Sequence, residues 1–116
     1  MDEKRALIIH GYERALRVSH EMLGHASTGQ WQQLIELEHD YLCEIDRLRV
    51  RDGQVTLDSD RQAYKKEILA QLLENDHRLH ALLQQKLAEL SHLMEKSRVQ
   101  QQVNRAYSAA SAPMGE

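Results

Sequence analysis

The chain has 116 residues, of which 41% are hydrophobic and 28% are charged, and its formal net charge is −3. This length accommodates one domain with a modest core, and the charge supplies no basic field that would drive binding to nucleic acid. The sequence has one proline, one tryptophan and no phenylalanine, and it is rich in Leu, Gln, Glu, Ala and Arg, which are strong helix formers. We therefore predict an all-α fold.

Two features bear on the cellular compartment. The single Cys43 cannot form an internal disulfide, which suits a reducing compartment. No apolar run approaches the ~20 residues of a membrane span, and the N-terminal segment MDEKRALIIHGYER is too charged for a signal peptide. The sequence therefore predicts a cytoplasmic protein without a membrane span.

The first two helices are predicted from apolar residues that recur at helical spacing. A helix over 3–26 has one shared face, comprising Ile8, Tyr12, Ala15, Leu16, Ser19, Met22, Leu23 and Ala26. Gly29 is a helix stop. A second helix over 30–51 has an inner stripe of Trp31, Leu34, Leu37, Glu38, Tyr41, Leu42, Ile45 and Leu48, and arginines near its end complement the helix dipole.

A third helix is predicted over 59–96. Ser59 and Gln62 have the spacing of a capping box. Its apolar stripe continues without glycine or proline and comprises Ile68, Leu69, Leu72, Leu73, Asp76, Leu79, Leu82, Leu83, Leu87, Leu90 and Met94. The stretch Asn75-Asp76-His77 is the weak point, but a single helix is favoured. Since this helix is longer than the first two, we expect part of its leucine face to lack a cover.

The stripe changes face after Met94. On a straight helix, Val99 and Val103 would point to the side opposite Leu87, Leu90 and Met94, and Ser97 with Gln100 repeats the capping-box spacing. The predicted architecture is therefore an antiparallel bundle of three main helices within 1–96, followed by a short, weakly docked C-terminal fourth helix over 97–110. Residues 111–116 are expected to be a disordered tail.

Histidines next to glutamates raise the question of a metal site. Glu36 with His39, and Glu89 with His92, match the Glu-x-x-His element of di-iron helical bundles. Helical angles place both pairs away from the apolar stripes, whereas a metal in a bundle core needs ligands that point inward. No phosphate-binding loop or nucleophile–base arrangement is present either. We therefore predict no enzyme activity, no metal and no cofactor.

Asp76 and Trp31 each allow two interpretations. Asp76 lies within the leucine stripe, where an unpaired carboxylate would be costly to bury. It is either a register-setting or solvent-reached polar position at a seam, bonded to a neighbour such as Tyr41 or an arginine, or a polar contact in a groove that is not permanently filled. Trp31 is either an anchor at the end of the bundle or a binding hot spot.

Three motifs resemble the FliT family of flagellar export chaperones. The segment GQWQQLIELE, residues 29–38, resembles the family's G-x-W-x-x-L-I-E-L-E signature. Ile68-Leu69 with Asp76, and then Arg78-Leu79 and Leu82-Leu83, resembles its I-L-x-x-D-x-x-I-R-x-L pattern, with the arginine offset by one position. The segment VNRAY, residues 103–107, is similar to the R-A-Y with which many members end, although this chain continues for nine more residues.

The resemblance implies a cytoplasmic helical bundle that binds the C-terminal region of the filament-cap protein and holds it ready for type III secretion. It also implies contacts with the export ATPase and, in some bacteria, with the flagellar master transcription activator. In this family the last helix regulates access to partners. That role falls here on Arg105, Ala106 and Tyr107 and on their helix, which includes Val99 and Val103.

We expect the partner to bind a hydrophobic groove on the third helix, because an amphipathic client helix buries its apolar face in such a groove. The predicted groove comprises Leu69, Leu72, Leu73, Asp76, Leu79, Leu83, Leu87, Leu90 and Met94. Two alternatives remain open. One is a structural homodimer in which the uncovered leucines pair with a second copy, and the other is a protein-binding regulator without an export client.

Overall fold

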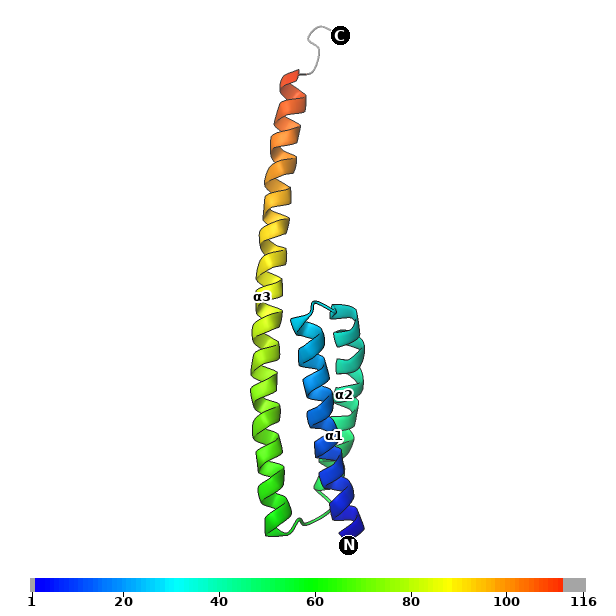
Figure 1. Cartoon of the computed structure of the whole chain (residues 1–116). Coiled ribbons are helices and arrows are strands. Elements are labelled where there is room, and N and C mark those ends of the chain that lie inside the picture. Colours follow the sequence, from blue (N-terminus) through cyan, green and yellow to red (C-terminus); the bar gives the residue numbers. More distant parts are fainter. Residues whose placement is uncertain (1, 112–116) are drawn as a thin grey trace. The chain divides into compact units, whose positions relative to one another are not determined.

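The computed structural model describes residues 2–111, with side chains to residue 109, and all three of its elements are helices (Figure 1). They are α1 (Asp2–Ser27), α2 (Trp31–Asp52) and α3 (Ser59–Ser111). The prediction of an all-α fold is confirmed. The chain divides into two compact units, one ending at Leu82 and the other beginning at Leu83, and each is described separately below. Most of the expected tail, residues 112–116, lies outside the described residues.

The turn between α1 and α2 is built around Gly29. Its φ of 74° lies in the left-handed region, which glycine adopts without the steric cost that a Cβ atom imposes. The backbone N–H of Gln30 donates to the carbonyl oxygen of His25 at 2.8 Å, and the N–H of Gly29 donates to that of Ala26 at 3.3 Å. The prediction that Gly29 ends the first helix is confirmed.

In the first unit, α1 and α2 lie antiparallel and side by side (Figure 1). Their approach is close at Gly11, where an added Cβ would lie 2.6 Å from a methyl carbon of Leu48. The first residues of α3 complete the core, whose buried members are Ile8, Tyr12, Ala15, Leu48, Ile68 and Leu72. The predicted inner face of α1 is confirmed, since all of its members are buried or partly buried. On α2 the prediction was wrong for Leu42, which is exposed.

A polar cluster joins all three helices of the first unit at the end of α2. The hydroxyl of Tyr12 donates to the Asp52 carboxylate at 2.7 Å, and the ammonium of Lys65 donates to the same oxygen at 2.9 Å. Burial of the phenol, and then its hydrogen bond to the Asp52 carboxylate, raises the pKa of Tyr12 above its ordinary value. This cluster therefore links the end of α2 to both α1 and α3.

The start of α3 is stabilised by a side-chain bond that the capping-box pattern did not include. The guanidinium of Arg61 donates to the Asp58 carboxylate at 2.8 Å, and this bond is the main cause of the lowered pKa of Asp58. The helix begins at Ser59, as predicted. The loop residues Val55 and Leu57 pack against the core.

The predicted turn at Ser97 and the fourth helix are wrong, because α3 continues to Ser111. Arg98 donates to Glu95 at 2.7 Å across the expected break, and the amide of Gln100 donates to Asn104 at 3.1 Å. Gln100 therefore makes an ordinary i,i+4 surface bond instead of closing a capping box. No glycine or proline interrupts α3, and the helix also continues unbroken through Asn75-Asp76-His77.

Candidate protein-binding surface

Within the first unit, the leucine stripe of α3 separates into two adjacent faces. Ile68, Leu72, Asn75 and Leu79 are all buried and follow the 4-3-4 spacing of a packed helical seam. Leu69 and Leu73 are exposed, because one residue step rotates a helical position by about 100°. Leu72 and Leu79, which we predicted to contact a partner, are both buried in the core.

Asp76 is exposed, so the question of an unpaired buried carboxylate does not arise. Its carboxylate lies 3.4 Å from Nδ1 of His80, which also donates to the Asp76 backbone carbonyl at 2.9 Å. Tyr41 has a raised pKa, first because the phenol is buried and second because of the negative charge of Asp76. Of the two interpretations, the structure therefore supports a solvent-reached position close to Tyr41.

The buried polar residue of this seam is Asn75, whose burial was not predicted although it belongs to the weak stretch Asn75-Asp76-His77. Its side chain is 7% exposed, and its amide nitrogen has no hydrogen-bond partner in the described part of the chain. The signal was present in the spacing, since Asn75 lies three residues after Leu72 and four before Leu79. Because an unpaired buried donor is costly, Asn75 marks a weak point in the packing of α3.

The second unit, described over residues 83–111, presents an apolar ridge. Leu83, Leu87, Leu90 and Met94 follow a 4-3-4 spacing and so share one helical face. Leu87 is 64% exposed, Leu90 42% and Met94 72%, while Leu83 is partly buried. Leu93, which the sequence analysis did not include, is also exposed. We call residues Leu83, Leu87, Leu90 and Met94 the leucine ridge.

The residues predicted to form a regulatory segment follow the leucine ridge on the same helix. Val99, Val103 and Tyr107 are exposed, as are Arg105 and Ala106. Every side chain from residue 87 to residue 109 is exposed. The apolar groups of this segment are therefore accessible in the structure.

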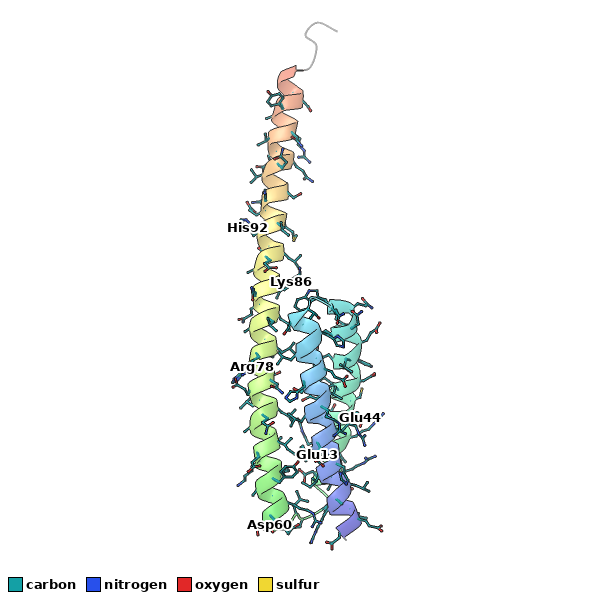
Figure 2. All side chains as sticks on the ribbon, in the orientation of Figure 1. Glu13, Glu44, Asp60, Arg78, Lys86 and His92 are labelled. Atoms are coloured by element: carbon teal, nitrogen blue, oxygen red, sulfur yellow. The ribbon has the colours of Figure 1, made fainter. Side chains whose placement is uncertain are left out.

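The described residues contain no arrangement that suggests metal chemistry. No three His, Cys, Asp or Glu side chains come together in residues 2–109 in a way that would hold a metal ion. Glu36, His39 and Glu89 are exposed, and so is His92, which is labelled in Figure 2. No described helix is long and apolar enough to cross a membrane. The exposed apolar side chains are therefore the feature from which a function can be inferred.

Comparison with known proteins identifies the family. The sequence model described as "Flagellar protein FliT" matches residues 9–109. The chain belongs to the FliT family. Curated FliT proteins of Pectobacterium atrosepticum and Photorhabdus laumondii are similar to it, at 31% and 32% identity. The alignment with the first covers 87% of this chain and 80% of the relative, and that with the second covers 92% and 85%.

A solved FliT structure shares the fold. The crystal structure of flagellar protein FliT from Bordetella bronchiseptica superposes with a TM-score of 0.68 at 28% sequence identity. The match covers 74% of this chain and 97% of the Bordetella chain. FliT proteins are a family of flagellar chaperones and not a family of enzymes. Chaperones bind other proteins, and the exposed apolar side chains of this chain are suited to such contacts.

Proposed function

We propose that this FliT protein is a cytoplasmic chaperone of flagellar type III secretion that binds the C-terminal region of the filament-cap protein. The observation that carries the proposal is the exposure of the leucine ridge on α3. Large apolar side chains grouped on one helical face are typical of surfaces that receive a partner helix. Membership of the FliT family supports this choice of client.

Covering the leucine ridge with a partner helix would bury apolar surface that is now exposed. Complete burial of a leucine or methionine side chain contributes about 1.5–3 kcal/mol. Since Leu87, Leu90 and Met94 are 42–72% exposed, covering each would contribute roughly half of that amount. Leu69 and Leu73 are exposed in the first unit, and we propose that the client also contacts them and the neighbouring Asp76.

We further propose that residues 97–110, including Val99, Val103, Arg105, Ala106 and Tyr107, control access of partners. The apolar side chains of this segment are Val99, Val103 and Tyr107, and all three are exposed on the continuous helix α3, where a partner can reach them. The export ATPase and the flagellar transcription activator are further proposed partners. Deletion of residues 97–116 should tighten binding of the cap protein's C-terminal peptide, and unchanged or weaker binding would contradict the regulatory role.

Isothermal titration calorimetry with a peptide from the C-terminal region of the cap protein tests the main proposal. The double variant Leu87→Glu/Leu90→Glu should bind at least tenfold more weakly than the parent chain. Ile35→Glu is the matched control, because Ile35 is an exposed apolar residue on α2. Equal affinity of parent and double variant would refute binding at the ridge.

The same exposure favours one alternative, a homodimer in which two leucine ridges pair. Analytical ultracentrifugation separates the two readings, because an obligate dimer does not dissociate to a folded monomer on dilution. A regulator without an export client would instead retain a transcription factor, and not the cap protein, in a pull-down from a flagellated cell lysate.

A further inference from the structure

A groove of about 490 Å³ lies between α1 and α2 in the first unit. Its apolar lining comes from both helices and from Val55 in the loop after α2, and it includes Leu7, Ile8, Ala15, Val18, Leu37 and Leu48. Gly11 also lines the groove, at the point where α1 closely approaches Leu48. Leu7 is 67% exposed, so the groove is an apolar surface open to solvent.

The rim of the groove is mainly basic. Its cationic side chains are Lys4, Arg14, Arg47 and Arg51, and its acidic ones are Asp40 and Glu44. Glu44, labelled in Figure 2, is already engaged, at 3.2 Å from Arg47 and 3.9 Å from Arg14.

The excess positive charge is concentrated at one end. Lys4 lies in the first turns of α1 and Arg51 in the last turn of α2, and the antiparallel arrangement brings these ends together (Figure 1). Neither side chain forms an ion pair within the described residues, whereas Arg14 and Arg47 at the rim pair with Glu44. An occupant with carboxylates at this end would therefore gain two charge-assisted contacts.

We propose that the groove between α1 and α2 docks an amphipathic helix of another protein, with acidic residues at the end that meets Lys4 and Arg51. The lining runs from Lys4 to Val18 along α1, and at 1.5 Å per residue this length accommodates about 14 residues of helix. The occupant's apolar side chains would cover Leu7 and the neighbouring apolar lining of the groove.

Charge argues against this chain's own C-terminal segment as the occupant. Residues 83–111 contain four cationic and two acidic residues, namely Lys86, Lys96, Arg98, Arg105, Glu89 and Glu95. A segment with this excess of positive charge would meet the basic end of the groove with like charge, which disfavours binding. The groove is thus distinct in position and in charge preference from the proposed client-binding ridge.

The probe for this groove is a synthetic 16-residue helix with leucines on one face and glutamates on both flanks, compared with its lysine counterpart. Titration of the ¹⁵N-labelled full chain should shift the amide signals of Leu7, Gly11 and Val18 with the glutamate peptide. Lys4→Glu/Arg51→Glu should weaken binding at least tenfold, Leu7→Glu should abolish it, and added salt should weaken it because exposed charges are screened.

Three results would overturn the proposal: no binding of the glutamate peptide, equal binding of the lysine peptide, or shifts confined to residues 83–94. Ile35→Glu is the control for placing a charge on an exposed apolar site of the same pair of helices. Leu87→Glu/Leu90→Glu should leave this binding unchanged. A failure here leaves the cap-protein experiment unaffected, since that experiment uses a different peptide and is read out on α3.

Discussion

Replacement of Asn75 by leucine should stabilise the protein. Asn75 is 7% exposed, its amide nitrogen has no partner, and its seam neighbours Leu72 and Leu79 are buried. Leaving a buried donor unpaired costs about 1–3 kcal/mol, and a buried leucine adds about 1.5–3 kcal/mol of apolar burial. The larger side chain will force local repacking, which typically costs about 1–3 kcal/mol. We therefore expect Asn75→Leu to raise the free energy of unfolding by about 1–3 kcal/mol.

Urea denaturation followed by circular dichroism measures this change. With a slope of about 1–3 kcal/mol per molar urea for a small protein, the midpoint should rise by about 1 M. Asp76→Leu is the matched control, since Asp76 is the next residue and is exposed, so it should change stability by no more than about 0.5 kcal/mol. A lower midpoint for Asn75→Leu would show that the amide is satisfied or that the seam cannot hold leucine.

Three further predictions concern the first unit. Because the pKa of Tyr12 is raised, its contribution to stability is complete below about pH 10 and is lost as the pH rises above that value. Between pH 9 and pH 11 the urea midpoint of Tyr12→Phe should therefore fall less than that of the parent chain. Identical falls would contradict this prediction. Gly11→Ala should lower stability by about 1 kcal/mol, because the new methyl group overlaps a core side chain. Gly24→Ala, with open space around it, should raise stability by about 0.5–1 kcal/mol. Thermal melts measure both changes, and equal effects would refute the close approach of α1 and α2. Asp52→Ala should cost about 2–4 kcal/mol in urea denaturation, because Asp52 is 17% exposed and accepts two hydrogen bonds. Glu74→Ala, at an exposed ion pair, should cost at most about 1 kcal/mol. Similar costs would contradict a stabilising role of the polar cluster.

The sequence predicted the parts of the fold that depend on local chemistry. Gly29 ends α1, and Ser59 begins α3, because a left-handed turn and a helix start have recognisable residues. The inner face of α1 was also predictable, since apolar residues occupy only one side of that helix. On α3 the pattern was ambiguous. Leucines occupy two adjacent faces, and only packing against α1 and α2 decides which of Leu72 and Leu73 is buried.

The errors at the C-terminal end of the chain have a related cause. A Ser-x-x-Gln spacing occurs readily in a helix rich in polar residues, so Ser97 and Gln100 did not distinguish a helix start from a helix interior. A change of apolar face indicates a turn only where both faces pack against a partner, and Val99 and Val103 are exposed. The groove between α1 and α2 was not predictable, because it depends on how closely Gly11 approaches the neighbouring helix.

The most direct test of the proposed function is to map the cap protein's C-terminal peptide on the ¹⁵N-labelled full chain by NMR. The largest amide shifts are expected at Leu83, Leu87, Leu90 and Met94, with changes in residues 97–109 if this segment controls access. Saturable binding whose shifts leave residues 83–94 unaffected would contradict the assignment of α3 as the client-binding helix.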